Sequence, residues 1–125
     1  MEPLVFPPLS EIEEITVKRL EPDGGTLTEF KIYDPQEVEK ILAELQTNNT
    51  GYLSDMEGMA PQEYAVAVDT KEGMAAMTWI GPDWLGGVDE HHKDEKGGLV
   101  SHFRKLDEEQ HERLLILLRQ PEEPR

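Results

Sequence analysis

The pattern of apolar and polar positions is clearest over residues 64–84, where two strand-like runs flank a polar turn. In the first run, large side chains alternate with Ala65 and Ala67, a period of two that is typical of a β-strand. The second run ends before Gly81-Pro82-Asp83. This segment predicts a central β-hairpin, and its face of small residues favours a helix packed close against it.

Three further strands are predicted from alternating segments. Residues 12–20 and 26–33 flank a turn built on Pro22 and Asp23, which together favour a tight hairpin. In the second of these strands Phe30 and Ile32 are expected to face inward. Residues 99–106 alternate in the same way and predict the last strand.

Two helices are predicted, each from a capping signal followed by an apolar stripe. Asp34-Pro35 with Glu37 begins the first, which extends to about Asn48 and carries Val38, Ile41, Leu42 and Leu45 on one side. Asp107 with Gln110 begins the second, and its expected stripe contains His111, Leu114, Leu115 and Leu118, widened by Ile116 and Leu117.

The predicted fold is therefore a single α+β domain spanning residues 1–125. It has a mainly antiparallel sheet of about five strands and two helices, in the order β-β-α-β-β-β-α. Residues 1–10 contain three prolines and predict an extended arm. Residues 86–98 are charged and bounded by glycine pairs, which predicts a loop, and residues 120–125 form a polar tail.

The charge balance adds most to this picture, because 27 acidic residues stand against 12 basic ones and give a formal charge of −15. Such a field repels nucleic acid and attracts basic proteins. The simplest alternative is that the acidity only improves solubility. The sequence has no cysteine, no membrane-length apolar run and no signal-peptide pattern at its start, so we expect a cytoplasmic protein without membrane contact.

Candidate chemistry is sparse. His91 and His92, beside Asp89, Glu90 and Asp94, have ligand types that suit a divalent metal, but they lack the fixed spacing of a helical metal motif. No nucleophile motif accompanies Ser101-His102, and no glycine pattern for phosphate is present. We therefore expect no cofactor and no catalytic activity.

Two patches are candidates for binding a partner. In the first, Trp84 is a half-exposed anchor ringed by carboxylates, whereas Trp79 belongs to the core; the ring consists of Asp83, Asp89, Glu90, Asp94 and Glu95. The second patch places Asp55 and Glu57, with Glu63, beside Tyr52.

The capped helix, the strand pair YAVAVD and MAAMTWIGPDW, and the glycine-bounded loop together resemble bacterial immunity proteins that neutralise polymorphic toxins. The resemblance covers roughly residues 27–106 and is strongest to the Imm1-like group, partners of deaminase-type toxins. It implies inhibition by direct, non-catalytic binding.

The leading hypothesis is an acidic inhibitor that blocks the basic cleft of a toxin or nuclease domain without contacting nucleic acid itself. One alternative is a phage-encoded mimic of nucleic acid, and another is a small metal-dependent enzyme that uses the loop carrying His91 and His92. A third is a non-catalytic accessory domain that dimerises through the helix containing Leu114 and Leu118. The protein is expected to be a monomer or such a homodimer.

Overall fold

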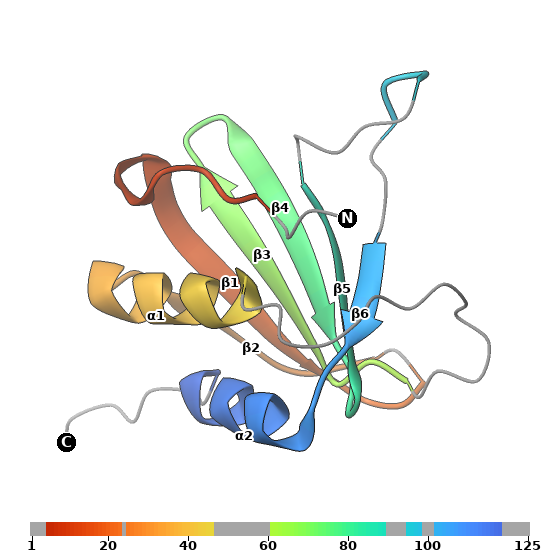
Figure 1. The fold of residues 1–125 in the computed structure, drawn as a ribbon. Coiled ribbons are helices and arrows are strands. Elements are labelled where there is room, and N and C mark those ends of the chain that lie inside the picture. Colours follow the sequence, from red (N-terminus) through yellow and green to blue (C-terminus); the bar gives the residue numbers. More distant parts are fainter. Residues whose placement is uncertain (1–4, 24, 47–60, 90–94, 99–101, 119–125) are drawn as a thin grey trace, which may run out of the picture.

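The computed structural model describes residues 5–23, 25–46, 61–89, 95–98 and 102–118 (Figure 1). A 3₁₀ turn, Leu9–Glu11, leads into a six-stranded antiparallel sheet and two helices. The strands are β1 (Ile12–Leu20), β2 (Thr26–Ile32), β3 (Tyr64–Thr70), β4 (Gly73–Ile80), β5 (Trp84–Asp89) and β6 (His102–Lys105). The helices are α1 (Pro35–Gln46) and α2 (Glu108–Leu117). The α+β fold class predicted from the sequence is confirmed.

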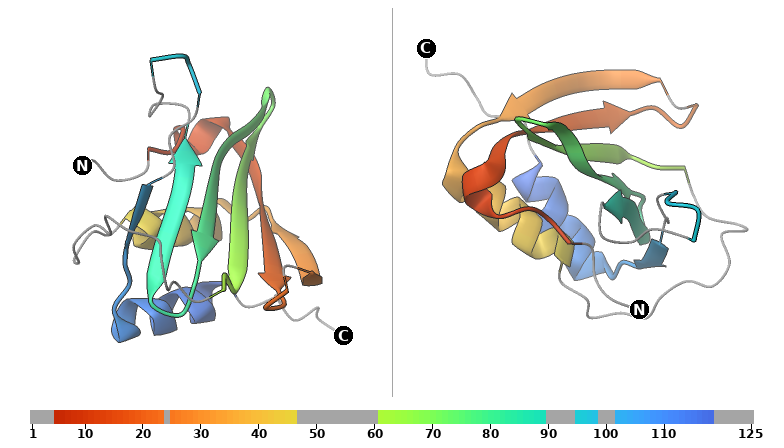
Figure 2. Two further views of the ribbon diagram at one scale, coloured as in Figure 1. Left: turned by 90° about the vertical axis from the view of Figure 1, so that its right-hand side faces the viewer. Right: turned by 90° about the horizontal axis from the view of Figure 1, so that it is seen from above.

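The sheet curves around the two helices, which pack side by side on its concave face (Figure 2). Its strand order is β2-β1-β3-β4-β5-β6, so the strands follow chain order except that β1 lies between β2 and β3. Neighbouring strands in the sheet therefore run in opposite directions. β2 and β3 both pair with β1, so they run the same way, and the segment that contains α1 links them from one end of the sheet to the other, whereas each remaining connection stays at one of the two ends. We call these the lower end, where β1 finishes and β3 begins, and the upper end, where β3 finishes and β4 begins, as they lie in Figure 1.

The hydrophobic core lies between the concave face and the helices. Ile15 of β1 pairs with Val68 of β3, and Val17 pairs with Val66, and all four side chains are fully buried. The predicted stripe of α1 covers them: its buried residues are Val38, Ile41, Leu42 and Leu45, as its period indicates. The large residues of β3 face the helices and the alanines face away, so the prediction that a helix packs on the alanine face is wrong. Larger side chains bury more apolar area against a helix than alanine does.

The second helix differs in part from its predicted stripe. Asp107 caps α2 by accepting a hydrogen bond from the Gln110 backbone N–H at 2.7 Å, and Leu114 and Leu118 are buried. Gln110 is buried as well, and its side-chain amide donates to the backbone oxygen of Glu44 near the end of α1, which offsets part of the cost of burying it. Ile116, in contrast, is exposed. Gln110, predicted only as a residue of the helix cap, therefore joins the two helices.

The structure has six strands rather than about five, because residues 84–89 form β5 within the segment whose 86–98 portion was expected to be a loop. Because Gly86 and Gly87 have no side chains, this strand lacks the alternation of apolar and polar residues by which strands are predicted. A Cβ atom added to Gly86 would lie less than 3.0 Å from the ring of Phe103 on β6. Here glycine marks a close approach between neighbouring strands rather than a hinge.

The remaining boundary predictions are only partly covered by the described residues. Residues 5–8 have no regular structure, in agreement with an extended arm, but the arm ends in the 3₁₀ turn at Leu9. Within the described residues the last strand has the bounds His102–Lys105, so it ends one residue before the predicted Leu106. Residues 1–4, 90–94, 99–101 and 120–125 of the predicted arm, loop, strand and tail lie outside the described residues.

The packing of Phe103 over Gly86 can be tested by substitution. We expect Gly86→Ala to lower the free energy of unfolding by about 1–3 kcal/mol, because the new methyl group overlaps the aromatic ring. Urea denaturation of the purified protein measures this change. As a control, the same substitution in a Phe103→Ala background should cost clearly less, since the ring is gone. Equal costs in the two backgrounds would contradict the proposed contact.

Candidate functional site

Trp84, the predicted anchor of the first patch, begins β5 and is only 7% exposed. Its indole packs over Gly81, and its ring centroid lies 5.8 Å from that of Phe103. Trp79 on β4 is the more exposed of the two tryptophans and stacks on Phe103 with centroids 6.4 Å apart. The sequence predicted a half-exposed Trp84 and a Trp79 that belongs to the core. The structure instead buries Trp84 and leaves Trp79 partly exposed.

The acidic residues of the first patch do not form one ring around Trp84. Asp83 precedes β5 at the lower end and Asp89 finishes it at the upper end, so the strand separates them by about 20 Å. Asp89 is 1% exposed and accepts a hydrogen bond of 2.8 Å from the backbone N–H of Val5, which fixes the N-terminal arm. Asp83 and Glu95 are exposed. Glu90 and Asp94 lie outside the described residues.

The second patch is described only at Glu63. Its carboxylate lies 2.8 Å from Nε2 of His111, which ties the start of β3 to α2. Tyr52, Asp55 and Glu57 lie outside the described residues, and so do His91 and His92 of the metal hypothesis. Within the described ranges no three histidine, aspartate or glutamate side chains gather in a way that could hold a metal ion.

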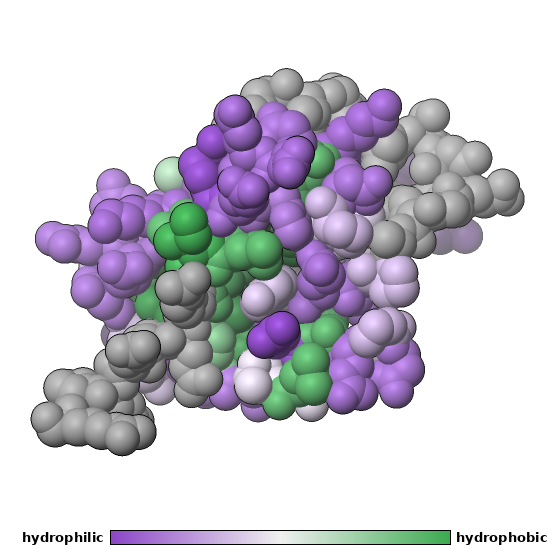
Figure 3. Space-filling model, turned by 90° about the horizontal axis from the view of Figure 1, so that it is seen from below, coloured by the Kyte–Doolittle hydropathy of each residue, from purple (hydrophilic) through white to green (hydrophobic). Residues whose placement is uncertain are grey.

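One concave surface among the described residues is at the lower end of the sheet, and we call it the lower hollow. It has a volume of about 430 Å³ and opens between the β1–β2 turn, the start of β3, the β4–β5 turn and α2. Figure 3 views the molecule from below, where apolar side chains gather near the middle of a mostly hydrophilic face. The lining residues are Arg19, Leu20, Pro22, Leu27, Pro61, Gln62, Glu63, Tyr64, Pro82 and Leu115.

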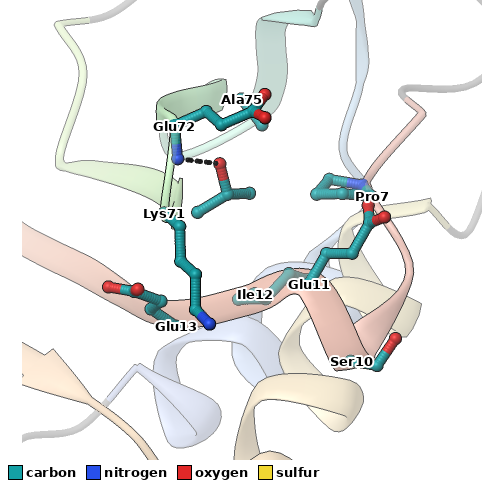
Figure 4. A pocket seen from close by; sticks show the side chains of 9 residues that line it. Pro7, Ser10, Glu11, Ile12, Glu13, Lys71, Glu72 and Ala75 are labelled. Carbon is teal, nitrogen blue, oxygen red and sulfur yellow. Dashed lines mark hydrogen bonds between the residues drawn. The ribbon is translucent and has the colours of Figure 1, made fainter.

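A second concavity, the upper hollow, lies where the 3₁₀ turn and the start of β1 meet the β3–β4 turn (Figure 4). Its volume is about 350 Å³. The turn is fixed by Thr70, whose hydroxyl accepts from the Glu72 backbone N–H at 3.2 Å and donates to the Gly73 carbonyl at 3.0 Å. The lining residues are Pro7, Ser10, Glu11, Ile12, Glu13, Thr70, Lys71, Glu72 and Ala75. This surface is more acidic than the lower hollow.

Several basic side chains are already engaged within the fold. Lys31 lies 3.1 Å from Glu14, and their hydrogen bond raises the pKa of Lys31 above its usual value. Arg113 forms an ion pair with Glu44 that likewise raises the pKa of Arg113. Arg104 is buried and donates to the backbone oxygen of Leu45. Lys31 and Arg113 therefore each neutralise one carboxylate, and the acidic residues in excess of such pairs determine the sign of the surface charge.

Comparison of the chain with protein-family models, with curated proteins and with solved structures finds no match in any of the three. In the described part of the chain, no helix has the length and apolar character needed to cross a membrane. Functional inference therefore rests on the residues and their geometry.

The lower hollow was not predicted, although the sequence contains a signal for it. Pro22 and Pro82 were used above only as residues of two separate turns. Both turns, and Pro61 just before β3, lie at the lower end of the sheet, because β1 and β4 finish there and β3 begins there. Leu115 could not be added to this group from the sequence, because its position depends on how α2 packs.

The two aspartates that flank β5 should differ in their effect on stability. Asp89→Ala removes the buried acceptor of the Val5 N–H, and we expect it to lower the free energy of unfolding by about 1–3 kcal/mol. Asp83→Ala changes the formal charge equally at an exposed position, and we expect a change within about 0.5 kcal/mol. Urea unfolding curves of the two variants make the comparison. If both variants unfold at the wild-type midpoint, Asp89 has no structural role.

Proposed function

We propose that this protein is a small inhibitory binding protein of the immunity type. It blocks the basic active-site cleft of a toxin or nuclease domain by direct contact and performs no reaction itself. A cytoplasmic location belongs to the same proposal. The resemblance of residues 27–106 to immunity proteins of polymorphic toxins leads to the same class of function.

The observation that carries the proposal is the one-sided charge of the surface. The formal charge is −15, and Lys18, Lys31 and Arg113 are each paired with a carboxylate. Among the described acidic residues only Asp89 is buried, so the others remain at partly or fully exposed positions. A surface of this kind favours approach of a basic protein.

Charge and contact contribute to different steps of such an inhibition. Long-range attraction between the acidic surface and a basic cleft speeds encounter and is screened by salt over about 10 Å at 0.1 M. Once the partners touch, apolar packing and short-range pairs determine how slowly they separate. An acidic protein that occupies a basic cleft also excludes the polyanionic substrate for which the cleft is built.

The proposal predicts one basic partner with salt-sensitive association. We would use the purified protein as bait in a lysate of its own source at low salt, elute with a salt gradient and identify the proteins by mass spectrometry. We expect one stoichiometric basic protein whose activity is blocked at equal molar amounts. Raising the salt from about 50 mM to about 500 mM should slow association about tenfold or more and change dissociation much less.

Two results would count against this function. A mixture of generic basic proteins, or none at all, would mean that the acidity only improves solubility. A single partner whose association rate is insensitive to salt would show that the charge does not drive recognition. Surface plasmon resonance with the recovered partner separates the two rate constants.

A further inference from the structure

We propose that the lower hollow is the surface on which the partner docks, and that its occupant is a partner segment in which one apolar side chain lies between basic residues. This inference rests on the proposed function, which supplies a basic partner. It adds the place of contact and the local chemistry of the segment that binds there.

The walls of the hollow are suited to an apolar side chain. Most of its lining is apolar and comes from leucine, proline and tyrosine side chains. Leu27 is 50% exposed on the edge strand β2, and Leu115 of α2, which also lines the hollow, is partly exposed. A volume of about 430 Å³ falls within the range of pockets that bury organic groups. An apolar anchor in such a pocket is the usual centre of a protein interface.

The rim of the hollow supplies the complementary charge. Glu108 and Glu112 are exposed and precede Leu115 by seven and three residues, so they lie on the same side of α2. Glu63 contributes a further carboxylate from the start of β3, against the single guanidinium of Arg19 in the lining. Basic residues on either side of the apolar anchor therefore meet carboxylates along α2 and β3.

The hollow is formed before any partner arrives, because backbone hydrogen bonds hold its walls. Leu20 donates to the backbone oxygen of Glu63 at 2.8 Å, and Glu63 donates to that of Ile80 at 2.7 Å. The carboxylate of Glu63 contacts His111 at 2.8 Å and attaches this wall to α2. A preformed surface loses little conformational entropy on binding, which strengthens a small contact.

Two synthetic peptides and two matched variants test the inference. The first peptide carries a leucine between pairs of arginines, and the second carries a serine in its place at the same charge. We expect the wild-type protein to bind the leucine peptide about tenfold more tightly at low salt, measured by fluorescence anisotropy. Leu27→Gln should remove this preference, because it takes away one apolar wall.

Met74→Gln is the control, since Met74 is 49% exposed, lies in a strand as Leu27 does, and is at the upper end of the sheet. The leucine preference should persist in this variant, and circular dichroism confirms that both variants fold. If the wild-type protein binds both peptides equally, or if Leu27→Gln keeps the preference, the docking site is wrong while the charge-based function stands. If neither peptide binds, attraction for basic segments is absent and the proposed function fails as well.

Discussion

The structure depends on the register between β1 and β3. Ile15 faces the same side as its partner Val68, and Val17 faces the same side as Val66, so one continuous apolar surface is available to α1. A shift of one residue would turn Thr16 and Lys18 into the core, which makes alternative registers costly. The same register places Arg19 beside Tyr64 at the lower end, and so it also assembles the wall of the lower hollow.

Local signals in the sequence were sufficient for most of the fold. The bounds of β1 and the buried stripe of α1 were predicted closely. The spacing of apolar residues and the capping residues depend only on the sequence of each element itself. The strand β5 was not predicted, because Gly86 contributes no side chain to a period and takes its role from Phe103, seventeen positions along the chain. Similarly, the burial of Trp84 depends on Gly81 and on Phe103, and only the packed sheet brings all three together.

The candidate site was less predictable for the same physical reason. Acidic residues close in sequence, such as Asp83 and Asp89, are separated by the length of β5, and one of them is consumed in holding the arm. Residues distant in sequence, such as Pro22, Pro82 and Leu115, line one hollow. Several turns and a helix form this surface. Residues that are close in the sequence are therefore often far apart on it, and residues that are distant in the sequence can lie together.

The distribution of charge on β1 and β2 helps to explain why a partner can reach an apolar surface more easily at the lower end of the sheet than along the edge of β2. Lys18 with Glu29, and Lys31 with Glu14, form cross-strand pairs, and their exposure to solvent leaves each pair with little effect on stability. Their greater effect is on association. Charged side chains along an edge strand such as β2 oppose pairing with another strand, because docking would remove water from them. Leu27, near the start of β2, lies beyond these pairs and faces the lower hollow, so an apolar contact can form there without desolvating them.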